Sequence, residues 1–290
     1  MHCLSVCKPK AIEVREGSRM DWKSLQDTPP WEWPEGASKM LLGALRDDRT
    51  PESDRLLAVE LAGVFGVVDD ELVDALLLIV ASGERSAEVR GKAAISLGPV
   101  LEHADTAGFE DDDDAPIAEA TYHQVRESLQ RLYTDARVPK DVRRRILEAS
   151  VRAPQDWHGD AIRTAFRSDD EASKLTAVFC MRFVPGFDAL ILEALATKNP
   201  GIHYEAVQAA GNRELDDAWP HVVDLLSSGQ TAKPLLLAAI EAAASIRPGE
   251  AAEVLVDLAD SDDEDIAAAV DEALAMAEGL SAFEDDDAGS

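Results

Sequence analysis

The chain has 290 residues, of which 46% are hydrophobic but only 5% aromatic, so any large core has to be built from aliphatic side chains. Ala and Leu, which are strong helix formers, favour packed helices over sheets in such a core. The 57 acidic residues against 28 basic ones give a net charge of −29. That charge repels phosphate groups, which argues against nucleic acid and anionic membranes as partners.

The N-terminal part differs from the rest of the chain. Residues 1–19 lack helical periodicity and are comparatively basic, so we expect an extension that is disordered or non-native. Residues 20–36 are rich in Trp and Pro and are expected to form a cap. The longest apolar run, Ala75–Ala81, is too short to span a bilayer. Three cysteines do not make a disulfide framework, so a cytoplasmic protein is expected.

Seven alanine-rich segments recur between residues 37 and 280. They begin at Asp54, Val89, Val142, Ala172, Ile202, Leu235 and Ile266. Consecutive starts lie about 30 residues apart, a period typical of stacked helical hairpins. The one longer interval contains an acidic insert at 103–116 and a longer third unit.

Within most segments, small or apolar residues stand at the first, fifth and ninth positions, as in Val89, Ala93 and Leu97. A spacing of four puts these residues on one helix face, which we expect to be the core face. Another amphipathic stretch, such as Glu71–Val80, precedes each segment. The sequence therefore predicts an all-α fold, a right-handed α-solenoid of about seven stacked helical hairpins. An acidic disordered tail is expected over 281–290.

The segment EVRGKAAISLG, from Glu88 to Gly98, resembles the second helix of a HEAT repeat, in the short form also found in bilin-lyase-like proteins. The resemblance covers roughly residues 37–280. It implies that the second helices line a concave inner surface. It also implies that the arginine at the second position of several segments, as in Arg55, Arg90 and Arg143, links neighbouring repeats.

We find no motif that indicates catalysis. HEAT-repeat enzymes that bind iron do so through paired His-Glu dipeptides, and this chain has none. Its six histidines fall in different units, none paired at helical spacing, whereas metal ligation needs three or four converging donors. Cys180 stands at a core-facing position, where a thiol is inert. We therefore predict a non-enzymatic protein with no metal and no cofactor.

Two columns of residues are expected to face the concave groove. The residue six beyond each segment start gives a mostly acidic row: Glu60, Ile95, Glu148, Val178, Gln208, Glu241 and Glu272. The residue two beyond each start gives a row with a cationic and aromatic middle: Leu56, Gly91, Arg144, Lys174, Tyr204, Leu237 and Ala268. We predict that the polar members of both rows bind a partner. The simpler alternative is that Arg144 and Glu148 only pair with each other, four residues apart on one helix.

These observations favour a protein–protein interaction scaffold whose groove binds a basic protein segment. A first alternative is an enzyme or enzyme subunit of the bilin-lyase-like type, holding a small molecule in a pocket lined by Trp157, His158, Tyr204 and Trp219. A second alternative is a self-associating structural module.

The net charge has two competing interpretations, adaptation to a salty cytoplasm and attraction of a basic partner. Adaptation predicts that the melting temperature rises as salt increases from low to molar concentration, because ions screen the repulsion between carboxylates. Thermal denaturation over a salt series measures this. A melting temperature that does not change with salt would exclude adaptation and favour the partner interpretation.

Overall fold

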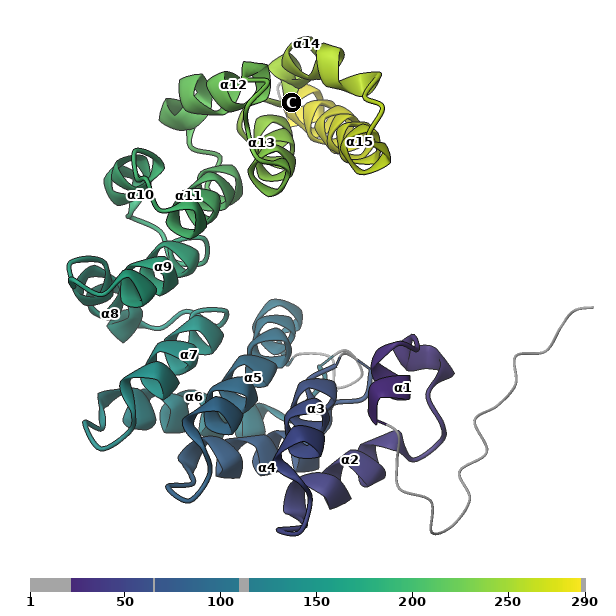
Figure 1. Ribbon diagram of the computed structural model, residues 1–290, viewed down its shortest axis with the longest axis vertical. Helices are drawn as coiled ribbons and strands as arrows, with labels where there is room; N and C mark the ends of the chain where they lie inside the picture. Colours follow the sequence, from purple (N-terminus) through teal and green to yellow (C-terminus); the bar gives the residue numbers. More distant parts are fainter. Residues whose placement is uncertain (1–21, 65, 110–114, 288–290) are drawn as a thin grey trace, which may run out of the picture. The chain divides into compact units, whose positions relative to one another are not determined.

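The computed structural model describes residues 22–64, 66–109 and 115–287. These residues form helices joined by short loops and include no β-strand, which confirms the predicted all-α solenoid (Figure 1). None of the helices in these ranges is both long and apolar enough to cross a membrane. The extension predicted over residues 1–19 lies outside the described residues.

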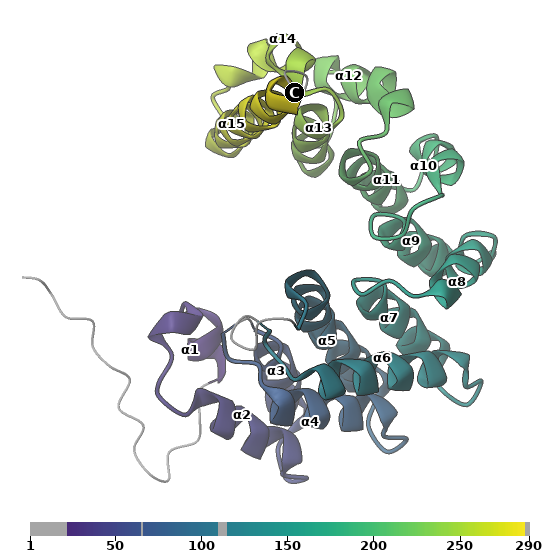
Figure 2. The ribbon, with the colours of Figure 1, turned by 180° about the vertical axis from the view of Figure 1, so that it is seen from behind.

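The first compact unit, Met1–Pro154, contains the cap and three hairpins. Each hairpin has a first helix and a second helix, and the three second helices pack one against the next (Figures 1 and 2). The first helices are α2 (Ala37–Arg46), α4 (Asp70–Ala81) and α6 (Glu119–Thr134). The second helices are α3 (Glu52–Ala62), α5 (Ala87–Ala107) and α7 (Lys140–Ser150). The cap consists of α1 (Trp22–Gln26) and the 3₁₀ helix η1 (Pro30–Glu32).

The second compact unit, Gln155–Ser290, contains four hairpins. Its second helices again pack one against the next, along the inner side of this unit's curve (Figures 1 and 2). The first helices are α8 (Asp156–Phe166), α10 (Asp188–Leu195), α12 (Trp219–Ser227) and α14 (Pro248–Ala259). The second helices are α9 (Glu171–Cys180), α11 (Pro200–Asn212), α13 (Lys233–Ile246) and α15 (Glu264–Asp287). The 3₁₀ helix η2 (Asp216–Ala218) leads into α12.

Each of the seven predicted segments lies on a second helix, so the described residues contain the seven predicted hairpins. The predicted core stripe is also confirmed, since Val89, Ala93 and Leu97 are at most 1% exposed. The stripe is less complete towards the C-terminal end, since Leu235 of α13 and both Ile266 and Leu274 of α15 are only half-buried.

Helix α5 is longer than its segment predicts, since it continues through Pro99 to Ala107. A proline inside a helix removes one hydrogen bond and crowds the preceding turn. The helix nevertheless continues because the turns after the proline bury apolar side chains, namely Val100, Leu101 and Ala104.

Two predicted acidic segments overlap with helices. The insert predicted over 103–116 begins within the end of α5, and its residues 110–114 lie outside the described residues. The tail predicted to be disordered over 281–290 is helical as far as Asp287, where α15 ends. Residues 288–290 lie outside the described residues.

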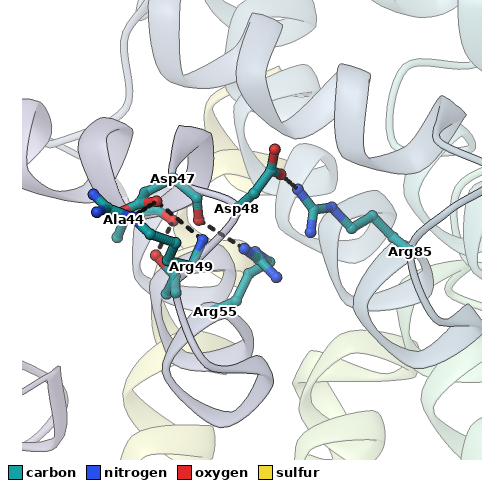
Figure 3. Close-up of polar contacts among 7 residues, drawn as sticks. Ala44, Asp47, Asp48, Arg49, Arg55 and Arg85 are labelled. Carbon is teal, nitrogen blue, oxygen red and sulfur yellow. Dashed lines mark hydrogen bonds and ion pairs between the residues drawn. The ribbon is translucent and has the colours of Figure 1, made fainter.

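The repeated arginine links the two helices of one hairpin. Arg55 Nη2 donates a hydrogen bond to the Asp47 carbonyl oxygen at the end of α2, at 2.8 Å (Figure 3). Arg90 Nε donates to the Val80 carbonyl oxygen near the end of α4, at 2.9 Å. For Arg55 and Arg90 this corrects the expectation that the arginine joins neighbouring repeats. The physical reason is that the last carbonyls of a helix have no N–H partner within the helix, and a guanidinium satisfies one of them.

Neighbouring hairpins are linked by side chains of their loops. Arg85, in the loop before α5, forms an ion pair with Asp48 in the loop before α3 (Figure 3). The adjacent Ser86 hydroxyl donates to the Glu52 carboxylate. These contacts hold the starts of consecutive second helices together.

Neighbouring second helices approach closely at the tenth residue of the repeat, which is glycine in three segments (Gly63, Gly98 and Gly211). A Cβ placed on Gly63 would lie 2.9 Å from Ser96 Cβ in α5, and closer still to the Ser96 carbonyl oxygen. A Cβ on Gly211 would lie 3.0 Å from Ala242 Cα in α13. Carbon atoms in favourable contact are about 3.5–4.0 Å apart, so there is no room for a side chain here.

We predict that Gly63→Ala lowers the free energy of unfolding by about 1–3 kcal/mol, because α3 and α5 have to move apart. Gly43→Ala in α2 is the matched control, since a Cβ at that position meets nothing within 4 Å. The control is expected to be neutral or to stabilise by up to about 1 kcal/mol, through helix propensity. Chemical denaturation followed by circular dichroism measures both variants, and equal midpoints would contradict the close approach.

Candidate protein-binding surfaces

A hollow of about 760 Å³ lies on the second-helix surface of the second unit, over α11, α13 and α15. We call it the α13–α15 groove. It is lined by Tyr204, Gln208, Lys233, Pro234, Leu237, Ala238, Glu241, Asp265, Ala268, Ala269, Glu272, Ala273 and Met276.

The floor of the α13–α15 groove is apolar because the alanine-rich character of the second helices extends beyond the core stripe. Leu237 is half-buried, whereas Met276 is 37% exposed. Ala268 and Ala269 also line the groove, with small side chains. An apolar surface with a few polar groups at its edge is the usual composition of a binding site.

Carboxylates dominate the charged groups of this groove. Glu241, Asp265 and Glu272 are exposed, and the groove contains one cation, Lys233. Lys233 Nζ lies 2.7 and 2.8 Å from the two Asp263 carboxylate oxygens and 2.7 Å from Asp265 Oδ2. These hydrogen bonds raise the pKa of Lys233. Since Lys233 is already neutralised by two aspartates, Glu241 and Glu272 leave the groove negatively charged.

Four of the eight predicted site residues line this groove together: Tyr204, Gln208, Glu241 and Glu272. Gln208 Nε2 donates a hydrogen bond to Glu241 Oε2 at 3.1 Å, which joins α11 to α13. The predicted residue Lys174 lies on α9 and is not among the lining residues. Its Nζ is 3.9 Å from Glu171 Oε1 on the same helix.

The remaining predicted residues lie in the first unit. Glu60 lines a separate hollow of about 570 Å³ over α3, α5 and α7. Its Oε2 atom is 2.8 Å from Lys92 Nζ on α5. The lining of this hollow carries both signs of charge, with Lys92 and Arg145 beside the acidic residues Glu60, Glu88 and Asp141.

Arg144 and Glu148 form the ion pair expected in the simpler alternative, and Arg145 also pairs with Glu148. Glu148 Oε1 lies 3.1 Å from Arg144 Nη1, and its Oε2 lies 2.5 Å from Arg145 Nη1. Glu148 is only 8% exposed. Two guanidinium groups thus hold this carboxylate in a buried position. The sequence predicted instead that Glu148 would be open to the groove as part of the acidic row.

The structure also pairs two histidines that lie in different units of the predicted repeat. His203 on α11 and His221 on α12 lie with their Nε2 atoms 2.7 Å apart. One ring has to donate the shared hydrogen and the other has to accept it, so this contact cannot form when both rings are protonated. Burial lowers the pKa of both rings, and the proximity of His221 lowers that of His203 further. Asp224 acts in the opposite direction on His221.

The part of the chain that the structure describes contains no cluster of three or more His, Cys, Asp or Glu side chains that could hold a metal ion. The thiol of Cys180 is buried at the core-facing position expected for it. A thiol in such surroundings is shielded from reagents.

The residues predicted to line a small-molecule pocket differ in their surroundings. Tyr204 lines the α13–α15 groove, whose lining includes none of the other three. His158 is fully buried on α8, and its Nδ1 accepts a hydrogen bond from the Gln155 backbone N–H at 2.9 Å. Trp219 is 8% exposed, and its ring lies 5.2 Å from the Arg247 guanidinium carbon.

No protein-family model matches this chain, and no curated protein matches its sequence. Among similar solved structures, an engineered protein is 18% identical, with a TM-score of 0.43 over 71% of this chain and 96% of the other. YibA of Escherichia coli is 17% identical, with a TM-score of 0.44 over 87% of this chain and 90% of the other. Human deoxyhypusine hydroxylase in complex with glycerol is 17% identical, with a TM-score of 0.39 over 89% and 88%. The fold assignment therefore rests on the helices and their packing.

The histidine pair predicts how stability depends on pH. Because the pKa of both rings is below the usual value of 6.5, the unfolded chain binds protons that the folded protein does not. Stability therefore decreases as the pH falls below about 6.5. We expect this decrease to be smaller in the His203→Gln/His221→Gln variant.

The measurement is urea denaturation of wild type and variant between pH 7.5 and 5.5, where carboxylates with ordinary pKa values near 4 remain largely ionised. His123, which is exposed, provides a control through His123→Gln. The same pH dependence in wild type and double variant would mean that the pair does not contribute.

Proposed function

We propose that this chain is a HEAT-like scaffold, with repeats of the short type found in bilin-lyase-like proteins, that binds a basic protein segment in the α13–α15 groove. The segment would place apolar side chains on the alanine-rich floor and its cationic side chains beside Glu241 and Glu272. No catalytic step is required of any residue.

The composition of the groove is the observation that supports this proposal. Its floor is apolar and its volume is about 760 Å³. Once Asp263 and Asp265 have neutralised Lys233, two exposed carboxylates remain in the lining, Glu241 and Glu272. A ligand with cations spaced along an apolar stripe matches both features. Docking of amphipathic segments into apolar grooves is a recurring mode of peptide recognition.

The packing of the second helices suits such a role. The close approach at Gly211 fixes α11 against α13, so the groove does not have to be ordered when the partner binds. A preformed surface reduces the entropic cost of association. The surplus negative charge would increase the association rate of a basic partner, and this effect should weaken with salt.

The test uses a fluorescent amphipathic helical peptide with lysines on one face and leucines on the other. We expect Glu241→Lys/Glu272→Lys to weaken its binding at least about tenfold, equivalent to ~1.4 kcal/mol, through loss of attraction and added repulsion. Fluorescence anisotropy titrations at low and physiological salt measure the dissociation constants.

Glu253→Lys/Asp257→Lys is the matched control, because both residues are exposed on α14, outside the groove lining, and the net charge changes equally. Equal weakening by both double variants would mean that the peptide responds to net charge and not to the groove. No binding by wild type at either salt concentration would refute the proposal.

A further inference from the structure

A third hollow lies on the first-helix layer of the first unit, between α4 and α6. It has a volume of about 550 Å³ and is lined by apolar residues of both helices, including Leu77, Leu78, Ala81 and Leu132. Arg46 at the end of α2 and Arg131 on α6 complete its edge. We call this hollow the α4–α6 groove.

Leu78 is a large apolar residue of the α4–α6 groove that is mostly exposed to solvent. Helix α4 buries most of its apolar side chains, yet Leu78 is 71% exposed. A single exposed leucine needs no explanation, but here the exposed side chain is continuous with an apolar hollow between two helices. Asp74 and Ala81 lie one turn before and one turn after it, so one stripe of α4 faces the groove.

The charged groups at this edge are mainly cationic. Arg131 donates hydrogen bonds to Ser128 Oγ at 2.8 Å and to a carbonyl of its own helix, and no carboxylate within the described residues lies at ion-pair distance from it. Arg46 Nη1 is 3.8 Å from Glu71 Oε2, and both side chains are mostly exposed, so this pair is weak. The one acidic lining residue, Asp74, accepts a hydrogen bond from Gln124 Nε2 at 3.0 Å.

The two grooves therefore have opposite local charge. Two arginines against one aspartate line the α4–α6 groove, whereas three carboxylates against one lysine line the α13–α15 groove. In a chain with a net charge of −29, this site is edged by two guanidinium groups, of which Arg46 forms a weak ion pair and Arg131 forms none with a carboxylate of the described residues. At physiological salt the screening length is about 8 Å, so a bound segment responds mainly to these nearby groups.

We propose that the α4–α6 groove binds an acidic amphipathic helix of a partner protein. Leucine or phenylalanine side chains of that helix would pack on Leu77, Leu78 and Leu132, and its carboxylates would pair with Arg46 and Arg131. Guanidinium groups suit this task because they bind carboxylates through two parallel hydrogen bonds. This proposal is independent of the function proposed for the α13–α15 groove, because the unit, the helix layer and the partner charge all differ.

The test starts with selection of displayed helical peptides, randomised on one face, for binding to the full-length wild-type protein. Sequences that also bind Leu78→Gln/Arg131→Gln are removed by counter-selection. We expect the remaining peptides to be rich in Asp, Glu and large apolar residues. Recovery of basic peptides, or of no peptide that distinguishes the two proteins, would overturn the proposal.

The selected peptide is then titrated by fluorescence anisotropy. We expect Leu78→Gln and Arg46→Gln/Arg131→Gln each to weaken binding at least about tenfold. The matched controls are Val256→Gln, since Val256 is 63% exposed on α14, and Arg167→Gln, an exposed arginine after α8. The controls are expected to bind like wild type, and equal losses in the controls would contradict a local site.

Sedimentation velocity experiments on the wild-type protein and on Leu78→Gln distinguish binding of another protein from binding of a second copy of the chain. We expect the two proteins to have the same sedimentation coefficient. A dimer that Leu78→Gln dissociates would identify the occupant as a second copy and would overturn the assignment to another protein.

Discussion

The close approach of neighbouring second helices is the constraint on which the rest of this structure depends. Where the repeat places Gly63 or Gly211, one backbone rests against the next helix with no side chain between them. The spacing of consecutive hairpins is then set by backbone contact, which is much less deformable than contact between long side chains. Outward-facing positions on α11 and α13 become neighbours as a result, as in the hydrogen bond between Gln208 and Glu241. The side chains at such positions determine the chemistry of the surface, whereas Gly211 determines how closely α11 and α13 approach.

Each unit thus has two surfaces that differ in composition, one formed by the second helices and one by the first helices. The second-helix layer has to stay rich in small residues in order to pack, and those residues also make an apolar floor where they reach the surface. The first-helix layer is under less restriction, because a Cβ placed on any glycine of its described helices (Gly43, Gly159 and Gly249) would not lie within 4 Å of a neighbouring helix. That freedom allows α4 to expose a leucine beside two arginines within a strongly acidic protein. Local groups and not the net charge determine recognition at such short range.

The repeat itself could be predicted from the sequence, because residues four apart on one helix share a face wherever the helix occurs. The same regularity brought four of the predicted residues into one groove, since equivalent positions of stacked helices lie side by side (Tyr204, Gln208, Glu241 and Glu272). Contacts that depend on a particular neighbour could not be predicted. Glu148 is held inside because Arg145, which passes over Gly91, joins Arg144 in pairing with it. The two paired histidines meet only through the path of the chain between α11 and α12.

The bonds made by Arg55 and Arg90 have a consequence for how such an array can change over generations. Each guanidinium binds a main-chain carbonyl of its own hairpin, an acceptor that every amino acid supplies. Substitutions at the end of the first helix therefore leave this bond intact. Both the donor and the acceptor of the bond belong to the same hairpin. Duplication or loss of a whole hairpin removes no partner that another hairpin needs for this bond. This hydrogen bond is therefore no obstacle to a gain or loss of length in steps of one repeat.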